Sequence, residues 1–98
     1  MKYIVVKVVR YGKPDAYRAL LFSKEFSHDC IYRGARESIY TDEHHAEFSA
    51  VGAGFVTFTD GLADCFGESA TLEIKSRGNA DTQVVRHFLA TGFECVIN

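Results

Sequence analysis

The sequence has no long apolar stretch, no pair of closely spaced cysteines and no overall excess of positive charge. A membrane-spanning helix needs roughly 20 apolar residues, whereas the apolar run at 16–22 is already broken by Arg18. Lys7 interrupts the apolar start of the chain before a secretory signal core is complete. We therefore expect a cytoplasmic protein that does not enter a membrane.

The formal net charge of −2 argues against direct binding to nucleic acid, because such binders need a clustered positive surface that displaces counterions from phosphates. The glycines at 52 and 54 lack the third glycine and the following helix of a dinucleotide-binding fingerprint. Three cysteines without a C-x-x-C pair indicate neither a disulfide framework nor a zinc ribbon. We expect buried, inert thiols, although Cys30 at a helix start could be read as a nucleophile.

One dense cluster of metal-ligand residue types is present, with Glu43, His44, His45 and Glu47. It lacks the H-x-x-x-H and C-x-x-C spacings that are specific for metal sites, so a solvated strand end is the better interpretation. We therefore predict no catalytic residue, no metal and no cofactor.

The 98 residues, 47% of them hydrophobic and 24% charged, are typical of one small folded domain. Alternating or β-branched segments predict strands at 2–10, 16–22, 47–59, 62–66 and 69–75, with an optional last strand at 93–97. Asp60-Gly61 is typical of a tight hairpin turn. Helices are expected from Ser27 to about Ser38 and over 80–91, the second capped by Asn79 or Asp81 and stopped by Gly92.

This order, ββαβββα with an optional final β, predicts an α+β fold in which two helices pack on one face of a mainly antiparallel sheet. In the strand at 47–59, Ala50 and Val56 are expected on the same face. Gly52 and Gly54 interrupt that strand and indicate a bulge or the close approach of another backbone. Small sheets have exposed edges, so we also consider a homodimer that pairs through the strand at 47–59.

Charge is distributed unevenly along the chain. Residues 1–36 carry eight basic and three acidic residues, residues 37–74 carry eight acidic and no basic ones, and residues 75–98 carry three basic and two acidic ones. One interpretation is that the two signs neutralise each other on neighbouring strands. The other is an acidic surface that steers the protein toward a partner with a basic surface. The residues of such a surface are Glu43, Glu47, Asp60, Asp64, Glu68 and Glu73.

An alternative function uses the start of the second helix. Lys75, Arg77 and Asn79 precede or open this helix, and free backbone N–H groups at a helix start can hold a phosphate or a carboxylate. This pattern favours a small-molecule, nucleotide or anion-binding module. The competing interpretation is a polar turn and a helix cap, because Asp81 already places a negative charge there.

The segments AGFV at 53–56, CFGES at 65–69 and LEIKSR at 72–77 resemble small uncharacterised proteins encoded by bacteriophages and prophages. The resemblance extends over residues 53–89, about a third of the chain, and departs from the family at Gly78-Asn79, where a proline-containing helix entry is expected. It implies a bacterial host cell and a non-catalytic protein that binds a host protein. Such a protein would act like an anti-CRISPR protein, by occluding a basic site on a host defence complex.

Overall fold

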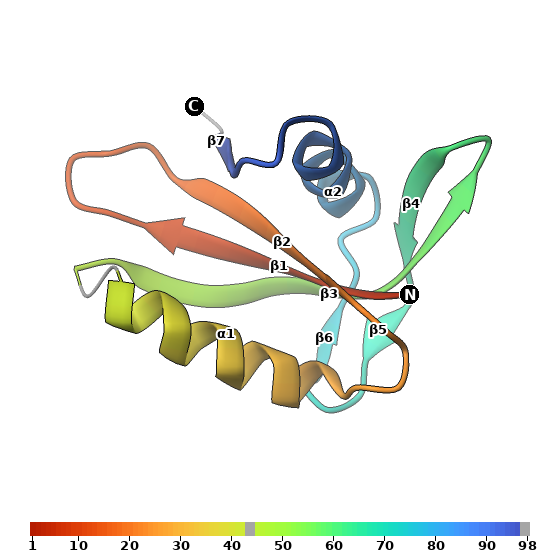
Figure 1. Ribbon diagram of the computed structural model, residues 1–98, viewed down its shortest axis with the longest axis horizontal. Helices are drawn as coiled ribbons and strands as arrows, with labels where there is room; N and C mark the ends of the chain where they lie inside the picture. Colours follow the sequence, from red (N-terminus) through yellow and green to blue (C-terminus); the bar gives the residue numbers. More distant parts are fainter. Residues whose placement is uncertain (43–44, 97–98) are drawn as a thin grey trace.

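The computed structural model describes residues 1–42 and 45–96, which form a sheet with strand order β4-β3-β1-β2-β7 (Figure 1). Every neighbouring pair in this sheet is antiparallel. The strands are β1 Lys2–Val9, β2 Ala16–Phe22, β3 Glu47–Thr59, β4 Leu62–Phe66 and β7 Cys95–Val96. The other elements are helices α1 His28–Asp42 and α2 Asn79–Thr91, and a small hairpin of β5 Glu68–Ser69 and β6 Ile74–Lys75. The α+β class with a mainly antiparallel sheet is confirmed.

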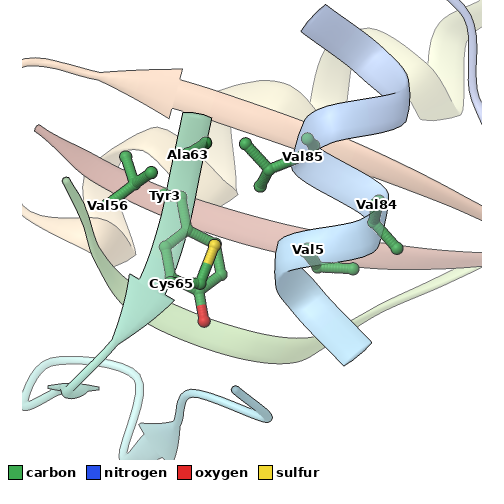
Figure 2. Close-up of a cluster of buried hydrophobic side chains, with 8 residues drawn as sticks. Tyr3, Val5, Val56, Ala63, Cys65, Val84 and Val85 are labelled. Atoms are coloured by element: carbon green, nitrogen blue, oxygen red, sulfur yellow. The ribbon is translucent and has the colours of Figure 1, made fainter. Parts of the chain in front are cut away.

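Strand β1 lies in the middle of the sheet and is apolar on both faces. Tyr3 and Val5 project to one face, where they form a buried cluster with Val84 of α2 (Figure 2). Val6 projects to the other face, in a second cluster against which Ile31 of α1 packs. The two helices therefore cover opposite faces of the sheet (Figure 1), and the prediction that both pack on one face is wrong. Because β1 buries side chains on both faces, each face needs its own cover.

Local signals explain the start of α1 and the end of α2. The hydroxyl of Ser27 accepts a hydrogen bond from the N–H of Cys30 at 3.2 Å, which makes Ser27 the predicted cap of α1. Helix α2 ends at Gly92, whose φ of 76° is left-handed as predicted. Its start differs from the prediction, because Gly78 is the N-cap and no side chain caps it. Within the described residues, neither helix is long and apolar enough to cross a membrane.

Strands β3 and β4 form the hairpin that the Asp60-Gly61 signal predicts. Thr59 pairs with Leu62, and the two residues between them have φ values of 53° and 80°. Two consecutive positive φ values are the signature of a type I′ turn, whose twist matches that of the strands.

Strand β3 contains a bulge. Val5 of β1 pairs with Gly52 and the next residue of β1 pairs with Ala50, which leaves Val51 as an extra residue. The extra residue reverses the alternation, so Ala50 lies on the α1 face and Val56 on the α2 face. The bulge at this glycine-rich segment is confirmed, and the prediction that Ala50 and Val56 share a face is wrong.

Residues 69–75 do not form the single strand that their alternation predicts. They fold into the β5–β6 hairpin, in which Ser69 pairs with Ile74. The Ser69 hydroxyl accepts a hydrogen bond from the Leu72 N–H at 3.2 Å, and Glu73 has a φ of 57°. A serine that bonds the backbone three residues ahead stabilises a turn, which here overrides the strand pattern.

The order of the strands also decides which edges are open. Strand β3 lies between β1 and β4, and β4 pairs only with residues 55–59 of it. A homodimer that pairs through β3 therefore stays a prediction. The edges of the sheet are β4 on one side and the short β7, next to β2, on the other.

Candidate functional site

The acidic residues that the sequence singles out do not gather on one surface. Glu43 lies outside the described residues. Glu47 opens β3 and Asp60 follows its last residue, so these two carboxylates lie at opposite ends of a 13-residue strand. Any acidic surface must therefore be built from the residues at the far end of β3.

Four of the predicted carboxylates belong to that end of the molecule, where the β3–β4 and β5–β6 hairpins lie (Figure 1). Two of them have a basic neighbour: Asp64 pairs with Arg86 of α2 at 3.0 Å, and Glu68 faces Lys75 across β5 and β6. Asp60 and Glu73 are exposed in turns. The fold thus neutralises part of this charge on neighbouring elements and leaves the rest to solvent.

An exposed apolar surface, which the sequence did not indicate, lies on the β3–β4 hairpin. Phe55, Leu62 and Phe66 are 36%, 55% and 49% exposed. Phe55 and Phe66 are directly paired across the two strands, with ring centroids 6.0 Å apart. Leu62, Asp64 and Phe66 alternate along β4 with two buried residues, so all three point to one side. We refer to Phe55, Leu62 and Phe66 as the hairpin face.

The alternation of β4 is the signal that could have located the hairpin face. The buried positions of β4 hold Ala63 and Cys65, which are small and do not mark a core side by themselves. Judged by size and hydrophobicity in the sequence, Leu62 and Phe66 look like the buried residues of β4. In the structure they are the exposed ones.

A buried histidine holds the hairpin face in place. The Nε2–H of His28 donates to the carbonyl oxygen of Gly54 at 2.9 Å. Its ring also meets Phe22 and Phe55 edge-on, with centroid distances of 5.4 and 6.1 Å. Burial lowers the pKa of His28 more than the bond to Gly54 raises it, so the ring is neutral near pH 7. A cavity of ≈ 310 Å³ beside it is lined by Phe55, Glu68 and Lys2, so an acidic and a basic side chain both border the hairpin face here.

The start of α2 is bonded internally. The Nε–H of Arg77 donates to Asp81 at 2.7 Å and its backbone N–H donates to the same carboxylate at 2.9 Å. Asp81 is fully buried and also accepts the hydroxyl of Tyr3 at 2.6 Å. Lys75 lies in β6 and Asn79 is the first residue of α2. An incoming anion would have to compete with Asp81 for Arg77, so the geometry adds no support to the anion-binding alternative.

The cysteines differ in environment. Cys65 is buried, and burial raises the pKa of its thiol to about 11. Cys30 is exposed, because α1 turns Ile31 rather than its neighbour toward the sheet, so the prediction of three buried thiols is wrong. Within the described parts of the chain, no three His, Cys, Asp or Glu side chains converge on a metal-sized site.

Comparisons with known proteins add no family. No family model matches the chain, and no curated protein or solved structure matches it either.

Proposed function

We propose that this is a non-catalytic binding protein whose hairpin face covers a basic site on a host protein. The resemblance of residues 53–89 to phage and prophage proteins supports a host defence complex in the bacterial cytoplasm as the target. Asp60 and Asp64 lie on the same hairpin as the apolar residues, Glu68 lines the cavity beside Phe55, and Glu73 lies in the turn between β5 and β6.

The observation that carries this proposal is the exposure of three large apolar side chains on one side of the β3–β4 hairpin. Phe55 and Phe66 are in contact, and Leu62 lies on the same side of β4 beyond Asp64. Exposed apolar side chains next to charged ones are characteristic of protein–protein interaction sites. The aromatic rings are held by the pairing of β3 with β4 and by the contact of His28 with Phe55. A preordered aromatic surface loses little side-chain entropy when a partner covers it.

Charge supports a basic partner. Asp60 is exposed at the tip of the hairpin and Glu68 lines the cavity beside Phe55. Carboxylates at the rim of an apolar contact speed association with a positively charged partner and repel an acidic one. Binding is therefore expected to weaken as the salt concentration rises.

The test is a comparison of variants against the purified host protein that the wild-type chain captures. The double variant Leu62→Ser, Phe66→Ser removes two apolar residues of the hairpin face and is expected to raise Kd about a hundredfold or more, as central interface anchors do. The variant Asp60→Asn, Glu68→Gln is expected to slow association about fivefold to tenfold at low salt. Isothermal titration and stopped-flow fluorescence measure the two effects.

Two matched variants serve as controls. Tyr11→Ser removes a fully exposed aromatic ring from the β1–β2 turn, and Glu25→Gln removes an exposed carboxylate before α1. Both are expected to bind as wild type. The proposal is contradicted if the Leu62→Ser, Phe66→Ser variant keeps its unfolding midpoint and its wild-type Kd.

A further inference from the structure

The hairpin face contains an exposed pair of aromatic rings. Phe55 and Phe66 lie opposite each other on β3 and β4, with their ring planes tilted by 33° and their centroids 6.0 Å apart. The ring of Phe55 also meets the buried ring of His28 edge-on. Because Phe55 and Phe66 are 36% and 49% exposed, the pair offers aromatic surface to a group of the partner.

Acidic groups border both rings. Asp64 precedes Phe66 by two residues on the same side of β4, which is a spacing of about 7 Å along a strand. Glu68 lines the cavity beside Phe55. Arg86 bonds one oxygen of Asp64 at 3.0 Å. Among the described residues, no other ion pair involves Asp64 and none involves Glu68, so the second oxygen of Asp64 and the carboxylate of Glu68 are available to a cation.

One basic side chain also borders this site. Lys2 lines the same cavity as Glu68. Its ammonium group donates a hydrogen bond to the carbonyl oxygen of Phe26 at 2.8 Å. Lys2 is therefore bonded to the backbone that precedes α1, and it leaves the carboxylate of Glu68 without a direct partner.

Elsewhere in the protein, an arginine already combines an aromatic ring with a carboxylate. The guanidinium carbon of Arg77 lies 5.4 Å from the centre of the Tyr17 ring, and its Nε–H donates to Asp81 at 2.7 Å. A guanidinium group can do both, because stacking uses its flat face and hydrogen bonding uses the N–H groups in its plane. The ammonium group of a lysine is compact and strongly hydrated, and it has no flat face to stack.

We infer that the basic group recognised by the hairpin face is an arginine side chain of the partner, which stacks on Phe55 and Phe66 and bonds to the second oxygen of Asp64. Glu68 adds attraction from the side of Phe55. This inference rests on the proposed function, because it names the group of the basic partner that the hairpin face contacts.

Two peptides of equal charge test the choice of arginine. One is an acetylated and amidated heptapeptide in which three arginines alternate with serines, and the other has lysines in place of the arginines. Each is added to the isotope-labelled protein at low salt, and NMR follows the ring signals of Phe55 and Phe66. The arginine peptide is expected to shift both rings saturably and to bind about threefold to fivefold more tightly than the lysine peptide.

A matched pair of variants locates the contact. Phe66→Leu keeps an apolar side chain on the hairpin face but removes the aromatic ring, so it is expected to reduce the preference for arginine to less than about twofold. Phe58 is also 49% exposed, and it lies on the opposite side of the same hairpin because it pairs with the buried Ala63. Phe58→Leu is therefore the control and keeps the wild-type preference.

A second pair of variants tests the carboxylate. Asp64→Asn keeps the size of the side chain and removes its charge, and it is expected to weaken binding of the arginine peptide about twofold to threefold. Glu25→Gln makes the same change of charge before α1 and keeps wild-type binding.

The inference is overturned if the two peptides bind equally, or if Phe66→Leu and Phe58→Leu have the same effect on the preference for arginine. These results differ from a failure of the proposed function. If the Leu62→Ser, Phe66→Ser variant loses the host protein while the arginine peptide binds no better than the lysine peptide, the hairpin face stays the binding surface and the assignment of arginine is wrong.

Discussion

The two edges of the sheet are treated differently. On β4, the carbonyl oxygen of Ala63 accepts the Nε–H of Arg86 at 2.8 Å, and the N–H of Cys65 donates to the hydroxyl of Thr82 at 2.9 Å. Both partners are side chains of α2, so this helix closes the backbone edge. At the other side, β7 covers only the first two residues of β2, and residues 19–22, which we call the β2 edge, have no second strand partner among the described strands.

This difference shows two ways of managing an edge strand. Unpaired edges invite pairing with other chains, and proteins limit this by capping or covering them. Side chains of α2 bond to the backbone of β4, so a partner of β4 is expected to contact the exposed side chains of the hairpin face rather than this backbone edge. No described strand covers the β2 edge, so the outward backbone groups of residues 19–22 are not used by the sheet.

The largest expected effect comes from loosening α2. Asp81→Ala removes the carboxylate that holds Tyr3 and Arg77, and we expect a loss of about 3 kcal/mol or more in the free energy of unfolding. The matched variant Asp64→Ala removes the exposed ion pair with Arg86 and is expected to cost about 0.5 kcal/mol. Urea unfolding measures both. Equal losses would show that α2 is not anchored by Asp81.

A smaller effect is expected from opening the β4 edge alone. Thr82→Val keeps the shape of a buried side chain but removes the acceptor of the Cys65 N–H, at a cost of about 1–2 kcal/mol for an unsatisfied buried donor. Gln83→Leu, at an exposed position of the same helix, is expected to change stability by about 0.5 kcal/mol or less. If the two variants unfold at the same urea concentration, the hydroxyl of Thr82 does not close this edge.

The smallest effect concerns the histidine beneath the hairpin face. Burial lowers the pKa of His28 in the folded protein, so below about pH 6.5 the unfolded chain binds a proton that the folded one does not. Stability is therefore expected to fall as pH decreases through this range, and His28→Gln should flatten the dependence. Urea midpoints between pH 5 and 8 measure it. Identical slopes in both proteins would contradict this role.

The sequence predicted the elements that depend on short-range signals. Asp60-Gly61 located the β3–β4 turn and Gly92 located the end of α2, because positive φ values are encoded by particular residues. The prediction of a single strand at 69–75 was wrong. The alternation of these residues is typical of a strand, but the hydrogen bond between Ser69 and Leu72 stabilises a turn. The apolar residues at 2–10 predict a strand buried on both faces, and buried clusters on each side of β1 confirm it. Placing both helices on one face left the other face without a cover.

The candidate sites were less predictable than the fold. A count of charge along the chain placed Glu47 with Asp60, yet the length of β3 separates them. The cavity beside Ala19 and Leu20 is lined by residues of β2, α1 and the end of α2. These residues are far apart in the sequence, and only the order of the strands brings them together. Cys30 was assigned to the core because a thin apolar stripe does not define which face of α1 meets the sheet.

Residue-resolved hydrogen exchange of the free protein tests the difference between the edges most directly. We expect strong protection of the Cys65 amide. Within the β2 edge, we expect protected amides that face β1 to alternate with rapidly exchanging amides that face outward. Uniform protection across residues 19–22, or a Cys65 amide that exchanges as fast as the outward amides of β2, would contradict it.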